Sequence, residues 1–466
     1  MKAVYYFLIS ITFIGCRDTK TEIQKPNILF FLIDDQRNDM MGCAGHPILK
    51  TPTIDALAKK GVRFENAFVT TSICAASRAS ILTGLYESRH GYTFGKNPIP
   101  TQLMAKSYPS VLKDSGYSTG FIGKFGVKLE KQDSMLKEMF DYYQPSPRLV
   151  PHFVEMDNGR RHSAEIKGDQ AVSFINNLSN SKPFCLSISF NAVHAVDSDK
   201  TPGNEGHYPF PEAVADLYEN IRMPAPNFSE PEVFDSHPDF LKNSLNRERF
   251  FWRWDTEEKY QINMRAYYRM ISGYDRVMNR VLLALKEKGL DKNTIIIFSA
   301  DNGYYMGNRG FAGKWSHYEE SLRVPLVIYD PRISSSQTNR AIDELSLNVD
   351  IPSTILDLAA VEVPDLYQGR SLRPLILEGD KDNWRKDFLI EHRMDNERIP
   401  KYVGVRGERY VYARYYDQNP PFEYLHDLVN DPHQLQNLAE NENYGSVKSE
   451  MRMRCEYLEQ YVKSDQ

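Results

Sequence analysis

Two sets of side chains in this 466-residue chain have the types and spacing needed for chemistry. The first is a thiol, Cys74, followed one helical turn later by Arg78, in a run of small residues that favours a turn opening into a helix. A helix N-terminus presents free N–H groups and the positive end of its dipole, so an anion could bind against this turn. The alternative is a buried structural cysteine beside a surface arginine, since free cysteines are usually buried.

The second set is acidic and follows two apolar runs of strand length. Asp34 and Asp35 end one run, and Asp301 and Asn302 end another. Because parallel strands deliver their carboxyl ends to one edge of an open sheet, we expect these four side chains to meet there. Three carboxylates and an amide offer only oxygen ligands, which favours Ca²⁺, with Mg²⁺ as the second choice. Each pair taken alone could instead be a turn or a helix cap.

The elements that must position these residues follow from the hydrophobic pattern. Apolar runs alternate with helical stretches, which predicts an α/β fold with a large, mostly parallel, doubly wound sheet flanked by helices. The expected strands are 28–33, 62–69, 117–123, 184–190 and 294–299, and the expected helices are 53–60, one beginning at Cys74, and 262–288. Residues 198–260, rich in Pro, Asn, Glu and aromatics, are expected to form a surface insertion that either walls the site or only decorates it.

Near residue 375 the pattern changes to short strands, which predicts a smaller C-terminal α+β subdomain with an antiparallel sheet. The runs concerned are strands at 388–390, 401–405, 410–412 and 422–425 and a final helix at 447–462. We therefore divide the chain into a catalytic domain over residues 26–375 and a C-terminal subdomain over residues 376–466.

The N-terminus differs from the rest of the chain. Residues 1–15 are mainly apolar and predict an export signal that is too short to span a bilayer, and residues 16–25 form a polar leader. Residues 13–16 resemble a bacterial lipobox, in which Cys16 would carry a lipid. A plain secretory signal and an N-terminal membrane anchor are the alternatives. We expect export to the periplasm, or to the outer membrane or cell surface, with membrane contact only through the lipid.

Charge and cysteine usage exclude other classes of protein. The net charge is −5 and no long basic run occurs, which argues against a nucleic-acid partner. The five cysteines have no regular spacing, which argues against a disulfide framework and against a tight zinc site.

Several motifs together carry a family resemblance. They occur in order along the chain, at residues 26–35 (PNILFFLIDD), 74–78 (CAASR), 122–124 (IGK), 299–303 (SADNG), 313–320 (GKWSHYEE) and 424–428 (YLHDL). In this order and rough spacing the chain resembles the type I, formylglycine-dependent sulfatases of the alkaline-phosphatase-like superfamily. The resemblance covers most of the chain, and it specifies a family without specifying a substrate.

The resemblance implies a role for each matching residue. Cys74 would be oxidised to a formylglycine aldehyde by a formylglycine-generating or anaerobic sulfatase-maturing enzyme, and Arg78 would hold this group. Lys124 and Lys314 would contact the sulfate, and His194 would assist departure of the substrate oxygen. The modified residue would bind Ca²⁺ together with the acidic set, Asp34, Asp35, Asp301 and Asn302.

One position departs from the family pattern. Gly126 stands where the family usually has a histidine that helps to collapse the covalent sulfate intermediate. Another residue must then supply the base, or regeneration is slow, or turnover has been lost. His90 and His317 lie in matching segments, but the sequence assigns neither as the replacement.

The expected activity is hydrolysis of a sulfate ester on an oligo- or polysaccharide. Five residues are candidate substrate contacts, namely Arg222, Arg253, Glu391, His392 and Arg393. The alternatives are a phosphodiester or phosphonate monoester hydrolase of the same superfamily and a non-catalytic glycan-binding relative.

Overall fold

The computed structural model describes residues 25–146, 152–157, 159–179, 182–202, 205–379 and 381–464. The predicted export signal and Cys16 lie outside these residues. Among the described residues, none of the helices combines the length and the apolar character needed to cross a bilayer.

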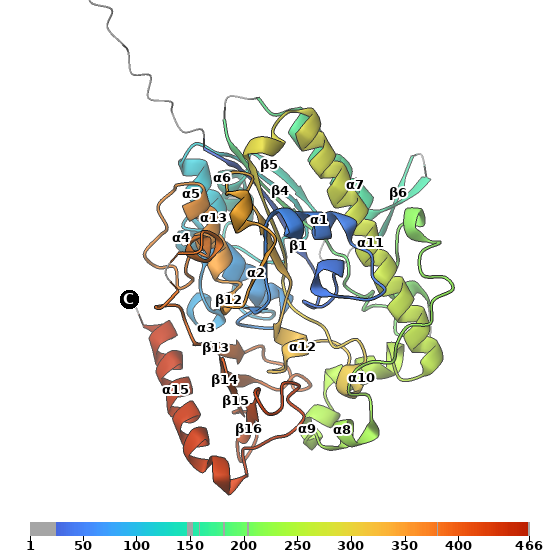
Figure 1. Ribbon diagram of the computed structural model, residues 1–466, viewed down its shortest axis with the longest axis vertical. Helices are drawn as coiled ribbons and strands as arrows, with labels where there is room; N and C mark the ends of the chain where they lie inside the picture. Colours follow the sequence, from blue (N-terminus) through green and yellow to red (C-terminus); the bar gives the residue numbers. More distant parts are fainter. Residues whose placement is uncertain are drawn as a thin grey trace, which may run out of the picture.

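A central eight-stranded sheet carries the fold, with the strand order β11-β2-β10-β9-β1-β8-β4-β5 (Figure 1). Five neighbouring strands, from β9 to β5, are parallel, and β10 is antiparallel to both of its neighbours. In sheet order the strands are Arg340–Ile342, Val62–Phe64, Leu326–Tyr329, Thr294–Ala300, Asn27–Ile33, Phe184–Ser189, Ser118–Gly123 and Tyr142–Pro145. The prediction of a mostly parallel sheet is confirmed.

Helices cover both faces of this sheet, which explains why β1 is buried throughout and apolar after Asn27. Figure 1 shows α7 and α11 side by side with α1 near them, and α2, α5 and α13 on the other side of the sheet. Phe31 of β1 stacks on Phe190, which contacts Tyr274 of α11, whereas Phe30 lies with Leu82 of α2 around a small cavity. The helices are α1 Pro52–Lys60, α2 Cys74–Thr83, α5 Tyr108–Asp114, α7 Ser163–Asn176, α11 Glu257–Glu287 and α13 Asp350–Leu358.

The C-terminal part forms the antiparallel sheet that the sequence predicts. Its four strands pair in chain order, and α15 (Gly445–Lys463) packs on β13, β14 and β15. The strands are β13 Asp387–His392, β14 Tyr402–Gly407, β15 Tyr410–Tyr415 and β16 Phe422–Asp427. The domain boundary after residue 375 stays a prediction.

Two expectations about the elements were wrong. The strand expected over 62–69 is split into β2 and β3 (Ala67–Phe68), which belong to different sheets. Arg323 binds the Glu65 carbonyl oxygen at 2.8 Å and Asn66 Oδ1 at 3.0 Å, so the chain leaves the main sheet there.

The insertion also has more regular structure than the sequence indicated. It contains the short helices α8 (Pro231–Asp235), α9 (Asp239–Lys242) and α10 (Leu245–Arg253). The long helix α11 begins at Glu257, five residues earlier than expected, because the Thr256 side chain caps it by accepting from Lys259 N at 3.3 Å. The four cysteines that the structure describes are free.

Candidate active site

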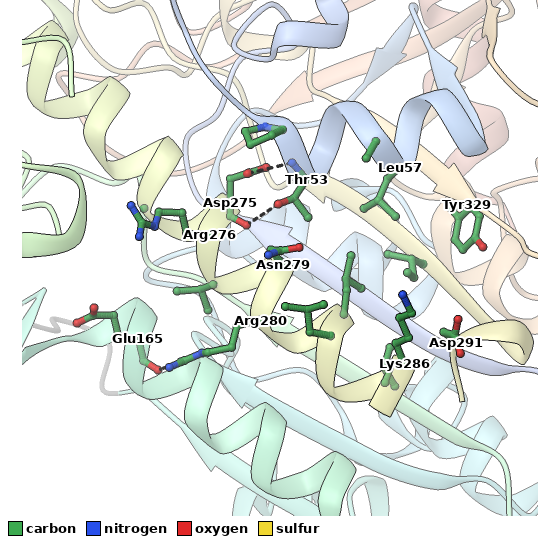
Figure 2. Close-up of a pocket in the computed structure, with 18 of the residues that line it drawn as sticks. Thr53, Leu57, Glu165, Asp275, Arg276, Asn279, Arg280, Lys286, Asp291 and Tyr329 are labelled. Carbon is green, nitrogen blue, oxygen red and sulfur yellow. Dashed lines mark hydrogen bonds between the residues drawn. The ribbon is translucent and has the colours of Figure 1, made fainter. Parts of the chain in front are cut away.

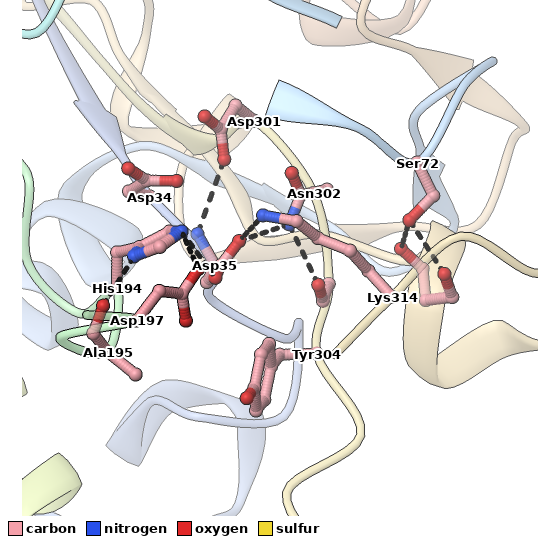
Figure 3. A network of polar contacts seen from close by, with 12 residues as sticks. Asp34, Asp35, Ser72, His194, Ala195, Asp197, Asp301, Asn302, Tyr304 and Lys314 are labelled. Carbon is pink, nitrogen blue, oxygen red and sulfur yellow. Dashed lines mark hydrogen bonds and ion pairs between the residues drawn. The ribbon is translucent and has the colours of Figure 1, made fainter. Parts of the chain in front are cut away.

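The acidic and basic side chains singled out above meet at the carboxyl edge of the sheet. Figure 3 shows six of them, namely Asp34, Asp35, His194, Asp301, Asn302 and Lys314. Asp34 and Asp35 follow β1, Asp301 and Asn302 follow β9, and Lys124 follows β4. The loop after β8 contributes His194, the loop after β9 contributes Lys314, and the N-terminal turn of α2 contributes Cys74 and Arg78. Four parallel strands and one helix therefore build a single site, as expected for an open parallel sheet.

Short contacts between neighbouring strand ends hold the acidic set in place. Asp301 Oδ1 accepts from Asp35 N at 3.2 Å, and Asn302 Nδ2 donates to Asp35 Oδ1 at 2.6 Å. The Lys314 ammonium group contacts Asp35, and the Lys124 ammonium group contacts Asp34. Asp35 has a φ of +59°, a backbone conformation that non-glycine residues rarely adopt.

Arg78 joins α2 to three strands of the sheet. Its Nε donates to Asp301 Oδ2 at 2.7 Å, and its Nη1 donates to the Lys124 carbonyl oxygen at 2.6 Å and to Ser189 Oγ at 2.5 Å. The guanidinium group is buried, and its planar fork suits this set of fixed acceptors. Its Nη2 has no hydrogen-bond partner among the described residues.

The charges of the site shift the pKa values of its carboxyl groups in opposite directions. Burial raises the pKa of Asp34, but the ammonium group of Lys124 and the other cations outweigh burial and hold the pKa below its ordinary value. Burial and the neighbouring charge of Asp34 raise the pKa of Asp301. The carboxylates in turn raise the pKa of Lys124 and of Lys314 above the ordinary lysine value, although burial opposes this. Both lysines are therefore cationic.

Cys74 is buried, with 5% of its surface exposed, at the first position of α2. Burial raises the pKa of its thiol, and the two lysines only partly oppose this. As a plain thiol it would be a weak nucleophile, because the thiolate is the reactive form. Its Sγ and one carboxylate oxygen each of Asp34 and Asp301 lie within 4.8 Å of one another.

The donor set fits a hard divalent cation. Asp34 Oδ1 and Asn302 Oδ1 are buried, and neither finds a hydrogen-bond partner among the described residues. Buried polar atoms without a partner are rare and call for a ligand or water. Since the nearby donors are mainly carboxylate and amide oxygens, Asp34, Asp35, Asp301 and Asn302 could hold Ca²⁺ or Mg²⁺.

His194 is one of the partly exposed members of the site. Its Nδ1 lies 2.7 Å from the Ala195 carbonyl oxygen, which can only accept, so Nδ1 carries a proton and donates it there. Its Nε2 faces two carboxylates, Asp35 Oδ2 at 3.7 Å and Asp197 Oδ2 at 3.8 Å.

The structure does not bring the five candidate substrate contacts to the site. Arg222 is exposed and pairs with Glu257 at the start of α11. Arg253 is fully buried and binds Asp197. Glu391 and His392 are fully buried in β13, and Arg393 bridges Glu391 and Glu459 of α15. Arg253, Glu391 and His392 therefore offer no surface to a sugar, whereas Arg222 is exposed.

Neither histidine that could replace the missing family histidine reaches the site. His317 is buried between Tyr415 Oη, at 2.9 Å, and His426 of the C-terminal sheet. His90 is buried and contacts Ser80 Oγ at 3.1 Å. Gly126 has a φ of +77°, and a Cβ atom there would lie 2.7 Å from Arg78 Cδ.

Sequence reasoning missed several residues that support the site. Tyr267 donates to the Asp35 carbonyl oxygen at 2.9 Å, and Asn246 Nδ2 donates to the Lys314 carbonyl oxygen at 2.5 Å. Both lie on helices remote in sequence, so no motif could reveal them. Asp197 is the supporting residue that the sequence could have suggested, because it lies three residues after His194.

A cavity of about 700 Å³ lies elsewhere, between α1, α11 and the start of α7 (Figure 2). Its most buried acid, Asp275, accepts from Thr53 N at 3.1 Å and Ile54 N at 3.0 Å and so caps α1. None of the residues described above as parts of the site lines this cavity.

Comparison with protein families decides the class of this site. The family model described as Sulfatase matches residues 26–361. The chain belongs to the sulfatase family. A second model, described as the C-terminal part of N-sulphoglucosamine sulphohydrolase, matches residues 307–461.

Individual relatives agree with this assignment. This sulfatase is 28% identical over 522 residues to an N-acetylglucosamine-6-O-sulfatase of Bacteroides thetaiotaomicron, a match that covers 98% of this chain and 91% of that protein. Its fold is similar to that of a protein solved in complex with its substrate D-glucosamine-2-N,6-O-disulfate, with a TM-score of 0.80 at 22% identity, covering 94% of this chain and 98% of the other. A phosphonate monoester hydrolase of Agrobacterium radiobacter gives a TM-score of 0.77 at 21% identity, covering 94% and 96%. The protein is therefore a sulfatase, a hydrolase of sulfate esters with the alkaline-phosphatase-like fold.

Proposed function

We propose that this sulfatase removes sulfate from a sulfated oligo- or polysaccharide, using a formylglycine made from Cys74 and a bound Ca²⁺ ion. The observation that carries the proposal is the position of Cys74 at the N-terminus of α2. Burial raises the pKa of its thiol, and the charges of Lys124 and Lys314 act on it. A sulfate ester placed there meets the positive end of the α2 dipole and two ammonium groups. These groups stabilise the negative charge that shifts between oxygens during sulfuryl transfer.

The reaction is R–O–SO₃⁻ plus water, giving R–OH, sulfate (SO₄²⁻) and a proton. One hydroxyl of the hydrated aldehyde at position 74 loses its proton to solvent, and its oxygen bonds to sulfur as the bond from sulfur to the substrate oxygen breaks. His194 Nε2 supplies a proton to the departing oxygen. The second hydroxyl then loses its proton to solvent, its oxygen forms the aldehyde double bond, and the bond from carbon to the sulfated oxygen breaks and releases sulfate. Water adds to the aldehyde and restores the hydrate.

The remaining residues bind and orient the groups that react. Lys124 and Lys314 hold sulfate oxygens, and Arg78 holds residue 74 through its fixed position between Asp301 and Ser189. Asp34, Asp35, Asp301 and Asn302 would hold the cation, with Mg²⁺ as the second choice. When bound, the cation supplies positive charge that polarises the sulfate and favours the ionised nucleophile.

The substrate class rests on the relatives and on the N-terminal sequence. The N-acetylglucosamine-6-O-sulfatase and the complex with a disulfated glucosamine both concern sulfated sugars. The predicted export signal would take the protein to the periplasm or, as a lipoprotein, to the outer membrane or cell surface, where polysaccharides occur. A formylglycine-generating or anaerobic sulfatase-maturing enzyme would be its partner during synthesis.

The decisive experiment uses full-length protein made together with a maturation enzyme. Peptide mass analysis should find formylglycine at position 74, and sulfated mono- and oligosaccharides should release sulfate. Cys74→Ala should abolish sulfate release while the thermal unfolding midpoint stays within a few degrees of the wild type. Full activity in Cys74→Ala, or in protein with an unmodified thiol, would refute the proposal.

A second candidate function is hydrolysis of phosphonate or phosphate esters, favoured by the likeness to a phosphonate monoester hydrolase. The same matured protein is assayed with 4-nitrophenyl sulfate and with 4-nitrophenyl phenylphosphonate. Comparison of the two turnover rates distinguishes the sulfatase from the phosphonate hydrolase. Dominant phosphonate turnover would favour this second function.

A further inference from the structure

The solvent side of the active site contains a carboxylate with no role in the reaction as described so far. Asp197 lies three residues beyond His194, and 30% of its side chain is exposed, compared with 24% for His194. The acids at the strand ends are almost completely buried. A substrate that enters the site therefore passes beside His194 and Asp197.

Two arginines of the insertion fix Asp197. Arg249 Nη2 donates to Asp197 Oδ2 at 2.6 Å, and Arg253 Nη2 donates to Asp197 Oδ1 at 3.1 Å. The arginines lie four residues apart in α10 and so share one face of that helix. Only 11% of the Arg249 side chain and none of the Arg253 side chain are exposed, so this clamp is held in packed surroundings.

The clamp matters because of the orientation of His194. The bond from Nδ1 to the Ala195 carbonyl oxygen fixes the plane of the imidazole ring and leaves Nε2 as the nitrogen that faces the site. Two carboxylates lie near Nε2: Asp35, a candidate cation ligand, at 3.7 Å and Asp197 at 3.8 Å. Asp197 is thus the carboxylate whose negative charge remains beside Nε2 when Asp35 binds a cation.

We propose that Asp197, held by Arg249 and Arg253, is a positioning residue that aims the Nε2 proton of His194 at the oxygen leaving the substrate. The inference rests on the proposed sulfatase reaction and deepens it. It also gives the insertion a function, because α10 supplies both arginines. In the reaction, the bond from sulfur to the leaving oxygen breaks, that oxygen takes the proton from Nε2, and the neutral imidazole takes up one of the protons that the hydroxyls of residue 74 release to solvent.

The test uses two small substrates that differ in the basicity of the leaving oxygen. Phenyl sulfate releases a basic phenolate that needs a proton, whereas 4-nitrophenyl sulfate releases a phenolate stabilised by its nitro group. General acid catalysis contributes about 10² to 10⁴ to a rate when the leaving group needs the proton. Asp197→Asn should therefore lower kcat on phenyl sulfate by about 10-fold to 100-fold and change kcat on 4-nitrophenyl sulfate by less than about 3-fold.

Three further variants make the result specific. His194→Ala should show the same selectivity with a larger loss, and Arg249→Gln should show it with a smaller loss. Asp199→Asn removes the same charge two residues away and should leave both activities unchanged. Formylglycine content and the thermal unfolding midpoint are measured for every variant, so that losses of maturation or folding are seen directly.

The outcomes separate this inference from the proposed function. Equal losses on both substrates, no loss on either, or a rise in KM alone would overturn the positioning role of Asp197. A wild-type protein that contains formylglycine but cleaves neither sulfate ester would overturn the proposed function and this inference with it. A His194→Ala variant without selectivity would overturn the inference and the proton-donating role of His194, while sulfate release that depends on formylglycine would still support the proposed sulfatase function.

Discussion

At the scale of single residues, Gly126 lies against Arg78, at a place where a residue with a side chain would contact the arginine. A histidine at this position would place its Cβ atom 2.7 Å from Arg78 Cδ, so Arg78 would have to move to admit it. Arg78 in turn is fixed by Asp301, the Lys124 carbonyl oxygen and Ser189. The conformation of the Arg78 side chain therefore depends on a glycine at position 126.

Replacing this glycine should harm the enzyme even when the new side chain is small. We expect Gly126→Ala to lower the free energy of unfolding by about 1 to 3 kcal/mol from its positive φ, and to lower kcat because Arg78 must move. Gly95→Ala is a matched control, since Gly95 also has a positive φ, of +80°, but no atom within 4 Å of the added Cβ. Denaturant unfolding and kcat are the measurements. A control variant that lost as much activity would contradict the role assigned to Gly126.

At the scale of elements, the long helix α11 supports the site from behind the sheet. Tyr267 projects from this helix and donates to the Asp35 carbonyl oxygen, at the residue whose φ is +59°. The amide of the same residue is bound to Asp301. Both backbone groups of Asp35 are thus held by side chains from other elements.

Removing only the hydroxyl group tests this support. Tyr267→Phe should cost about 1 kcal/mol of stability, as for one buried hydrogen bond, and should lower kcat several-fold because Asp35 is held less firmly. Tyr268 lies on the same helix, and Tyr268→Phe removes a hydroxyl that contacts His46 in the loop before α1, so this variant should leave kcat unchanged. Steady-state kinetics with 4-nitrophenyl sulfate and thermal unfolding give both quantities. Equal kcat values in the two variants would argue against support by α11.

The elements also show what the sequence could and could not predict. Apolar runs that end in acidic residues identified β1 and β9. Because parallel strands end at the same edge of a sheet, these runs also placed their polar ends together, namely Asp34, Asp35, Asp301 and Asn302. The break after β2 was missed, since it depends on Arg323, which is distant in the sequence. The role of α10 was missed because its arginines matter only through Asp197.

At the scale of the whole molecule, a buried acidic pair joins the main sheet region to the C-terminal sheet. Glu87 of α3 (Glu87–His90) accepts from Thr71 Oγ1 at 2.6 Å, and Glu391 of β13 accepts from Ser88 N at 2.9 Å. Arg393 binds Glu391 at 2.6 Å. Sequence alone suggested Glu391, His392 and Arg393 as sugar contacts, because charged residues give no sign of being buried at a junction.

This junction should make stability depend on pH. Burial, together with the nearby charge of Glu391, raises the pKa of Glu87 to about 8 from 4.5. In the folded protein Glu87 keeps its proton up to about pH 8, whereas the unfolded chain loses it near pH 4.5, so stability falls as pH rises between these values. Glu87→Gln keeps a neutral group at every pH, so its advantage over the wild type should grow by about 1 to 3 kcal/mol from pH 5 to pH 8.

Denaturant unfolding of both proteins at several pH values measures this difference, and Glu130→Gln, at an acid outside the junction, serves as the control. A constant difference between Glu87→Gln and the wild type across this range would contradict the assignment.

The burial of α2 bears on when the proposed formylglycine could be made. All ten residues of this helix are buried, and Cys74 lies at its first position. If Cys74 is converted as proposed, a separate enzyme has to reach a thiol that the folded protein encloses. On that proposal the conversion precedes the closing of the chain around α2, and a protein that folds with an unconverted thiol stays unconverted until it unfolds.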